Sequence, residues 1–155
     1  MMHKITIRKA QKEDLPAIYT LVKELALYEK SPESVTATIE DYYQDFEDNI
    51  FESIVAERDT EVVGMALYYM TYSTWRGRML YLEDFVVKES ERKLGIGKLL
   101  FDEVIEIAKS KKAVLLKWQV LDWNDPAIQF YKKYDTIFEN EWLNGKLFLD
   151  PAIKN

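Results

Sequence analysis

The sequence of 155 residues contains no cysteine and a single histidine. Without cysteine, the chain can form no disulfide, no zinc site built on thiolates and no acyl-cysteine intermediate. Any group transfer would therefore be direct or use another nucleophile. The single histidine, His3, stands alone near the start of the chain, so we expect no role for it and no metal site.

Long apolar runs are missing as well. No stretch is long enough to span a bilayer, and polar residues begin within the first few positions, unlike a secretory signal. We expect a cytoplasmic protein without a membrane partner. Acidic residues outnumber basic residues by 27 to 21, which gives a net charge of −6. Such a charge repels nucleic acid and attracts cations, so we expect no nucleic-acid partner.

The length suits one compact domain over residues 1–155. Alternating polar and apolar residues indicate strands, and apolar residues at three- and four-residue spacing indicate helices. These patterns predict strands at 4–8, 54–58, 62–69, 79–87 and 114–120, helices at 13–28, 38–46, 96–108 and 124–133, and a final hairpin of 136–141 with 146–149. The strand at 114–120 is mostly apolar, so we expect it to be buried on both faces. This order predicts a mixed α/β domain.

A glycine-containing turn, Arg92-Lys-Leu-Gly-Ile-Gly-Lys98, precedes the third long helix. Small residues let a ligand approach the backbone, and the free N–H groups at a helix start favour an anion such as a pyrophosphate. The spacing matches neither a Walker loop nor a dinucleotide fingerprint. An ordinary glycine turn before a helix is the alternative interpretation.

Two adjacent acids, Glu83 and Asp84, interrupt the apolar strand from Leu80 to Val87. Neighbouring residues on a regular strand point to opposite faces, so we expect only one acid to face a given side. Burying an unpaired carboxylate is costly. Either each acid pairs with a nearby Arg or Lys, or the strand presents a carboxylate to a cationic ligand.

Several segments together resemble a known family. The Arg92–Lys98 turn resembles the acetyl-CoA pyrophosphate loop of GNAT acetyltransferases, and the order of elements is similar. Four segments resemble its diamine branch, the spermidine/spermine N1-acetyltransferases and thialysine acetyltransferases: Lys23–Glu29, Tyr81–Phe85, Gly95–Gly97, and Trp123–Pro126 with Phe130–Lys132. The resemblance extends from about residue 5 to residue 133. It implies a GNAT fold, in which helices flank both faces of a mixed, mostly antiparallel sheet.

The resemblance also implies an activity, the direct transfer of acetyl from acetyl-CoA to a primary amine of a small cationic acceptor, such as a polyamine or a lysine-like amine. It implies a homodimer as well. A non-catalytic acyl-CoA-binding module is an alternative, against which the presence of Glu83 and Tyr131 argues. A protein lysine or N-terminal acetyltransferase is another, although no peptide-binding insertion is visible.

Roles for individual residues follow from the same resemblance. Glu83 would attract the acceptor ammonium and help to remove its proton, and Tyr131 would protonate the departing thiolate, although a tyrosine beside Phe130 could simply pack. The residues matching coenzyme contacts are Phe85, Val86, Val87, Arg92, Lys93, Leu94, Gly95, Ile96, Gly97, Lys98, Asn124, Ala127 and Tyr131. The residues matching acceptor contacts are Tyr28, Glu29, Glu83 and Asp84. Trp75 is a further candidate for acceptor binding, because aromatic and acidic residues together suit a cationic ligand.

Two further features concern acidic residues outside these motifs. We expect Asp41 and Asp45 to lie on a solvated helix face rather than in a site. Family members usually have glycine in the turn after the tyrosine-containing helix, where this chain has Asp135. Aspartate tolerates a left-handed backbone better than most residues, so we expect the turn to survive.

Overall fold

The computed structural model describes residues 4–153, so His3 lies outside the described residues. The chain divides into two compact units, one ending at Trp118 and one starting at Gln119. Among the described residues, the first unit holds a five-stranded sheet and its helices, and the second holds one short α-helix and an extended segment. The prediction of a single domain over residues 1–155 stays a prediction.

The first unit follows the predicted order of strands and helices. Its elements are β1 (Ile5–Lys9), α1 (Leu15–Tyr28), α2 (Ile39–Glu47), β2 (Glu52–Arg58), β3 (Glu61–Ser73), β4 (Gly77–Val87), α3 (Ile96–Ser110) and β5 (Leu115–Trp118). The β2–β3 hairpin turns at Asp59 and Thr60, whose φ angles of 50° and 67° suit a tight hairpin turn. Strands β3 and β4 are longer than predicted, because their hairpin continues beyond the apolar segments.

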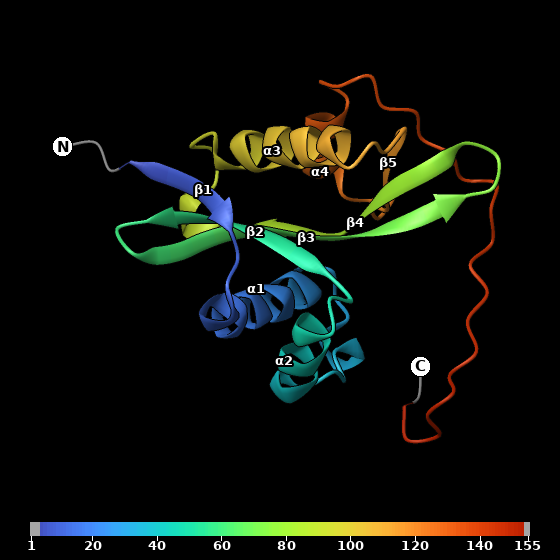
Figure 1. Ribbon diagram of the computed structural model, residues 1–155, viewed down its shortest axis with the longest axis horizontal. Coiled ribbons are helices and arrows are strands. Elements are labelled where there is room, and N and C mark those ends of the chain that lie inside the picture. Colours follow the sequence, from blue (N-terminus) through green and yellow to red (C-terminus); the bar gives the residue numbers. More distant parts are fainter. Residues whose placement is uncertain (1–3, 154–155) are drawn as a thin grey trace. The chain divides into compact units, whose positions relative to one another are not determined.

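The sheet has the strand order β1-β2-β3-β4-β5. Neighbouring strands are antiparallel except β4 and β5, which are parallel. A parallel neighbour needs a crossover connection, and α3 supplies it. Figure 1 shows α3 on one face of the sheet and α1 with α2 on the other. This confirms the mixed, mostly antiparallel sheet with helices on both faces.

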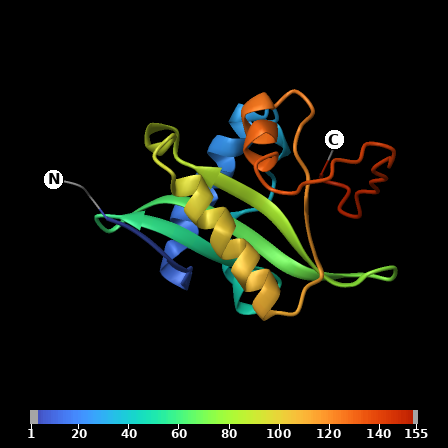
Figure 2. The same cartoon turned by 90° about the horizontal axis from the view of Figure 1, so that it is seen from above.

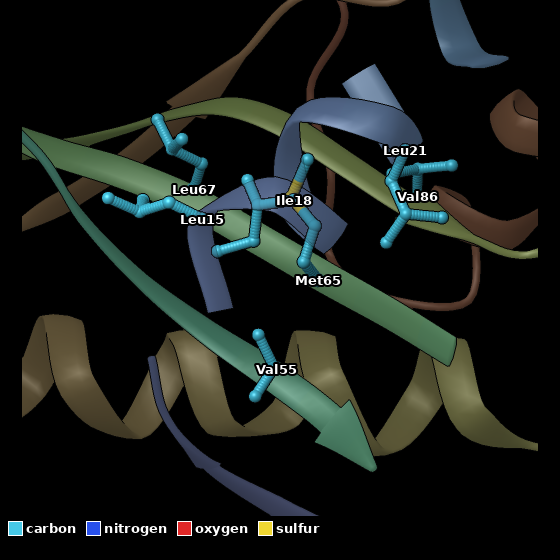
Figure 3. Close-up of a cluster of buried hydrophobic side chains, with 7 residues drawn as sticks. All are labelled: Leu15, Ile18, Leu21, Val55, Met65, Leu67 and Val86. Carbon is cyan, nitrogen blue, oxygen red and sulfur yellow. The ribbon is translucent and has the colours of Figure 1, made fainter. Parts of the chain in front are cut away.

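The face of the sheet that carries α1 and α2 holds an apolar core. The buried cluster consists of Leu15, Ile18, Leu21, Val55, Met65, Leu67 and Val86, and Figure 3 shows the helix side chains lying against the strands. The polar side of α2 is solvated, as predicted, because Asp41 and Asp45 are exposed. Asp41 also has a structural role, since its carboxylate accepts a hydrogen bond of 2.8 Å from the backbone N–H of Thr38 at the helix start.

The opposite face is covered by α3, which crosses the strands in Figure 2. The helix buries its own side chains Ile96, Leu100 and Val104 against the sheet. The helix approaches β3 closely at Gly64, where an added Cβ would lie 3.1 Å from Leu100 Cδ1 and 3.2 Å from the carbonyl oxygen of Val86. Glycine at this position therefore permits the close packing of helix on sheet.

Strand β5 differs from its prediction. It is limited to Leu115–Trp118 rather than 114–120, and it is not buried on both faces, because Leu115 is 40% exposed. A run of apolar residues predicts burial only where a layer covers each face. Among the described residues, β5 is the last strand of the sheet.

The second unit contains α4 (Asp125–Tyr131), as predicted, with Pro126 in its first turn. The predicted final hairpin is wrong, because residues 136–148 form no strand. The apolar side chains behind that prediction stay exposed, with Leu143 at 97% and Leu147 at 85%. A two-stranded hairpin is marginal in water unless another layer buries its apolar face, and the sequence pattern does not say whether such a layer exists.

Candidate active site

The two adjacent acids of β4 lie at a break in the strand register. Leu67 of β3 pairs with Asp84 and the next residue, Tyr68, pairs with Leu82, so Glu83 is an extra residue on β4. One extra residue against a regular partner is a β-bulge, and it interrupts the alternation of side chains.

The bulge places both acids on the face that carries α1 and α2. Asp84 pairs with Leu67, whose side chain belongs to the core under α1. Glu83 faces the same side, because its Oε1 accepts a hydrogen bond of 2.7 Å from the Tyr69 hydroxyl, and Tyr69 stacks on Tyr81 with 5.6 Å between ring centres. The expectation that the acids face opposite sides was therefore wrong, since it assumed a regular strand.

The charge state of Asp84 is unusual. Burial, followed by the charges of Glu83 and Glu29, raises the pKa of Asp84 to about 7. Burial also raises the pKa of Glu29, which caps the end of α1. With a pKa near 7, Asp84 is partly protonated at neutral pH. The three carboxylates of Glu29, Glu83 and Asp84, called the acid cluster below, therefore act on one another electrostatically.

Within residues 4–153, no basic side chain neutralises the acid cluster. Among residues 4–153, neither Glu29, Glu83 nor Asp84 forms an ion pair with a lysine or arginine. The interpretation that each acid pairs with a nearby cation is therefore wrong for the described residues. Charge without a partner beside a sheet surface is a feature of ligand sites more than of structural ion pairs.

Tyrosines surround the acid cluster. Burial raises the pKa of Tyr42 in α2 to about 12, with Asp84, Tyr19 and Glu83 adding to the effect. The rings of Tyr19 and Tyr42 meet edge to face at 4.9 Å. Aromatic faces attract organic cations, so these rings fit the same kind of ligand as the acids.

Sequence reasoning missed Tyr19, Tyr69 and Tyr81 as site residues. Tyr69 is paired with Tyr81 across the strands, and both lie on the acid-cluster face. Period-two alternation within β3 would have grouped Tyr69 with Leu67, but only the register of the β3–β4 pair brings it to Glu83. No comparable pattern in the sequence marks Tyr19 as a site residue.

The two aromatic residues predicted to contact the acceptor lie in different places. Tyr28, at the end of α1, lies beside the predicted coenzyme loop, with the Arg92 guanidinium 5.6 Å from its ring centre. Trp75 lies in the turn between β3 and β4 and is 81% exposed. At about 3.3 Å per strand residue, the part of β4 from Gly77, next to this turn, to Glu83 spans roughly 20 Å. The structure therefore does not bring Trp75 to the acid cluster.

The glycine turn has the backbone expected of an anion site. Gly95 is left-handed, with φ of 82°, and caps α3. The N–H of Leu99 makes the first helical bond, to the carbonyl of Gly95 at 3.2 Å. The N–H groups of Ile96, Gly97 and Lys98 therefore precede the helical hydrogen bonds and point outward from the positive end of the helix dipole. An anion could bind there.

Side chains of the turn are held by local contacts. The Arg92 Nε donates a hydrogen bond of 3.0 Å to the carbonyl of Val87, at the end of β4. Lys98 is paired with Asp102 at 2.6 Å, one helical turn further on. Lys93 and Leu94 are exposed, and Lys93 also has positive φ. The loop thus presents backbone groups and cationic side chains together.

Strand β4 links this loop to the acid cluster. Its pairing with β5 ends at Leu82 and Trp118, whereas its pairing with β3 continues to Val87. Phe85 faces α3, where its ring centre is 5.8 Å from that of Phe101, and Val86 is buried on the opposite face. The segment 83–87 therefore runs from the acids to the glycine turn.

The predicted residues of the second unit lie on α4. Asn124 caps the helix, since its Oδ1 accepts a hydrogen bond of 3.3 Å from the N–H of Ala127. Tyr131, at the last turn, is 7% exposed and meets Phe130 with 5.5 Å between ring centres. The turn after α4 needs no left-handed residue, because Asp135 is not among the residues with positive φ. Aspartate in place of glycine is therefore compatible with this backbone.

The described residues contain neither a membrane-spanning helix nor a metal-binding group of side chains. None of the helices within residues 4–153 combines the length and the apolar character needed to span a bilayer. Over the same residues, no group of three or more His, Cys, Asp or Glu side chains is arranged to hold a metal ion.

Comparison with known proteins identifies the family. Residues 15–135 match the acetyltransferase (GNAT) family. Thialysine N-epsilon-acetyltransferase of Caenorhabditis elegans is 36% identical over 120 residues, which cover 77% of this chain and 75% of that protein. The protein of the same name from Bos taurus is 39% identical over 138 residues, or 83% and 81% of the two chains. The human spermidine/spermine N(1)-acetyltransferase-like protein 1 is 35% identical and is matched over 94% of this chain and 23% of its own length.

Solved structures agree on the fold. An aminoglycoside acetyltransferase from a soil metagenomic sample superposes with a TM-score of 0.77 at 20% identity, covering 94% of this chain and 97% of its own. An acetyltransferase of Trypanosoma brucei gives a TM-score of 0.74 at 20% identity, with coverages of 93% and 100%. The acid-bearing strand and the helix-capping glycine turn occur in the predicted order within the matched family region. The chain therefore belongs to the GNAT acetyltransferase family and is an acetyl-CoA-dependent N-acetyltransferase.

Proposed function

We propose that the acetyl acceptor is a small cationic amine, a polyamine or a lysine-like amine, and that the acid cluster binds it. The observation that carries this proposal is the absence of any ion-pair partner for Glu29, Glu83 and Asp84 among the described residues. A bound ammonium would supply the missing positive charge, and the surrounding tyrosine rings would add cation–π attraction.

The names of the relatives support the same acceptor class. Thialysine is named in two of them and spermidine with spermine in a third. The compounds in these names are amines that carry more than one charged group or a charged side chain. A non-catalytic acyl-CoA-binding module is not favoured, because the relatives are named as transferases.

Acetyl-CoA would bind along β4 and the glycine turn. The N–H groups at the start of α3, with Arg92 and Lys93, suit the pyrophosphate. Backbone groups of Phe85 and Val87 would serve the pantetheine arm, beyond the last β5 partner at Leu82. Asn124 and Ala127 are proposed as further coenzyme contacts.

The chemistry would be a direct transfer. A carboxylate of the acid cluster, Glu83 in our proposal, takes a proton from the acceptor ammonium, through water. The free amine then attacks the thioester carbonyl carbon, the C–N bond forms, and the C–S bond breaks. The departing thiolate takes a proton, for which we propose the Tyr131 hydroxyl, and the proton that the attacking nitrogen loses as the amide forms restores this hydroxyl.

The acceptor proposal can be tested by measuring coenzyme A release from acetyl-CoA with a panel of amines. We expect diamines and lysine analogues to be acetylated, and neutral or anionic amines of similar size to react poorly. Glu83→Gln should raise the KM for the preferred amine at least tenfold while leaving the KM for acetyl-CoA nearly unchanged, because the amide loses its attraction for the ammonium. Parallel changes in both KM values would count against the proposal.

The role of Tyr131 needs its own test. Tyr131→Phe removes one hydroxyl and keeps the ring, so folding and acetyl-CoA binding should change little. Its kcat should fall by roughly 10²- to 10⁴-fold, the range for a positioned acid or base. The loss should shrink with an acyl donor whose thiol is more acidic. An unchanged kcat under conditions where chemistry limits the rate would make Tyr131 a packing residue.

We further propose a cytoplasmic homodimer that binds neither nucleic acid nor membranes. These points are supported by the resemblance to the diamine branch and by the net charge of −6. Light scattering would distinguish a dimer from a particle of 18.3 kDa, the mass of one chain.

A further inference from the structure

Glu83, the proposed base, stands where the sheet does not fix its side chain. It is the extra residue of the β3–β4 bulge, so no residue of β3 pairs with it, and it is exposed. A long, flexible glutamate side chain loses conformational entropy when it is held in one orientation. A carboxylate that takes a proton from a bound acceptor nevertheless has to lie within about 0.5 Å of its working position. A contact from elsewhere in the protein has to hold it there.

The Tyr69 hydroxyl supplies such a contact. It donates a hydrogen bond of 2.7 Å to Glu83 Oε1, a length that matches a bond from a hydroxyl to an ionised carboxylate. Burial, followed by this hydrogen bond, raises the pKa of Tyr69. The hydroxyl therefore keeps its proton at neutral pH and remains the donor. Within residues 4–153, no other hydrogen bond or ion pair holds the Glu83 carboxylate.

The ring that carries this hydroxyl is itself held in place. Tyr69 is half-buried and stacks on Tyr81, its partner on β4, with 5.6 Å between ring centres and 27° between ring planes. Tyrosine also has few side-chain torsions to restrain, so a stacked ring is a rigid anchor. The hydroxyl bonds to Glu83, whereas Asp84 acts on it through charge alone. The anchor therefore distinguishes between the two adjacent acids.

We propose that Tyr69 is a positioning residue, whose hydroxyl holds the Glu83 carboxylate in the orientation that takes a proton from the acceptor ammonium. This inference rests on the proposed role of Glu83. Tyr69 supplies no proton and acts through Glu83 alone. Removing its hydroxyl leaves the negative charge of Glu83, and with it the attraction for the ammonium, but lets the carboxylate turn away. The rate of transfer should therefore suffer more than the affinity for the amine.

Tyr69→Phe tests this role, because the ring and its stacking remain. The rate constant of acetyl transfer is measured in single turnover at saturating amine, per acetyl-CoA site counted by calorimetry, so that misfolded chains do not count. We expect it to fall roughly tenfold or more, while the KM for the amine changes by less than about twofold. Tyr72→Phe, in the same strand and 70% exposed, is the matched control and should react like the parent. An unchanged rate constant in Tyr69→Phe would overturn the proposal.

A double variant separates this inference from the proposed function on which it rests. In the Glu83→Gln background, adding Tyr69→Phe should change the rate constant by less than about twofold, because the group that the hydroxyl positions has lost its function. A similar loss in both backgrounds would overturn the proposal, since the hydroxyl would then act without Glu83. If Glu83→Gln alone reacts like the parent, the proposed role of Glu83 fails together with this one. If Glu83→Gln is slow and Tyr69→Phe is not, the positioning role alone fails.

Discussion

Two groups of carboxylates in the first unit differ in how the protein treats their charge. Asp14 and Glu57 are held by Arg8, which donates two hydrogen bonds to Asp14, of 2.8 and 2.9 Å, and one of 2.9 Å to Glu57. The hydrogen bonds from Arg8 lower the pKa of Asp14, whereas burial raises that of Asp84 in the acid cluster. The carboxylates held by the arginine support the fold, whereas the acid cluster, which has no ion pair among residues 4–153, is the one that we propose for the acceptor.

The largest expected effect comes from breaking the paired group. Arg8→Ala leaves Asp14 and Glu57 without their cation, and Asp14 is buried. Removing one partner of such a pair is strongly destabilising, and we expect a loss of about 3 kcal/mol in the free energy of unfolding. Urea denaturation would measure it. Arg78→Ala, at an exposed position, is the control and should cost much less. A loss below about 1 kcal/mol for Arg8→Ala would contradict the structural role of the pair.

The next effect concerns acceptor binding and pH. Asp84 becomes charged as pH rises through about 7, so its attraction for an ammonium grows over that range. The quantity to measure is the ratio of two kcat/KM values for the amine, that of the parent divided by that of Asp84→Asn. We expect this ratio to rise about tenfold between pH 6 and pH 8. The ratio removes the amine's own titration, which is common to both proteins. A ratio independent of pH would show that Asp84 does not titrate in the free enzyme.

The smallest effect is on stability, and it has the opposite sign to that of Arg8→Ala. The pKa of Asp84 is raised in the folded state, so folding favours its neutral form. The free energy of unfolding therefore falls as pH rises from about 4 to about 7. One pKa unit is worth about 1.4 kcal/mol, and partial exposure screens the full effect. Asp84→Asn should therefore stabilise the protein by about 1 kcal/mol at pH 8 and by little at pH 4.

The matched variant of the paired group sharpens the contrast. The pKa of Asp14 is lowered, so its ion pair contributes stability above pH 4 that is lost as pH falls further. Asp14→Asn should destabilise the protein at pH 8, where Asp84→Asn stabilises it. Thermal unfolding of the two variants at pH 8 gives the comparison directly. Shifts of the same sign would show that the two groups do not differ as described.

Local patterns in the sequence predicted most of the first unit. Leu15, Ile18 and Leu21 have helical spacing and are buried under the sheet, and the Gly95 turn begins α3 as expected. Both features depend on neighbouring residues in the chain. The same holds for Asn124, whose capping role follows from the residues that come directly after it.

Features that depend on distant residues were not predicted. The bulge at Glu83 is a property of the β3–β4 pair, so alternation within β4 alone gave the wrong face for one acid. Arg8 pairs with Asp14 and Glu57, whereas the acid cluster has no ion pair in the part of the chain that the structure describes, and this difference is likewise set by the fold. The hairpin predicted after residue 135 failed for the same reason, because an apolar pattern does not reveal whether a partner layer is present.

The extra residue in β4 constrains how the gene can vary. Deleting one codon at the position of Glu83 would restore a regular β3–β4 register, and it would leave one carboxylate where there were two. If the strand were one residue shorter and still carried both acids, one acid, or the side chains beyond it, would face α3. A point substitution in this strand leaves the β3–β4 register unchanged, whereas the insertion or deletion of a single residue shifts it. Alignments of related chains should show no length variation between Gly77 and Val87.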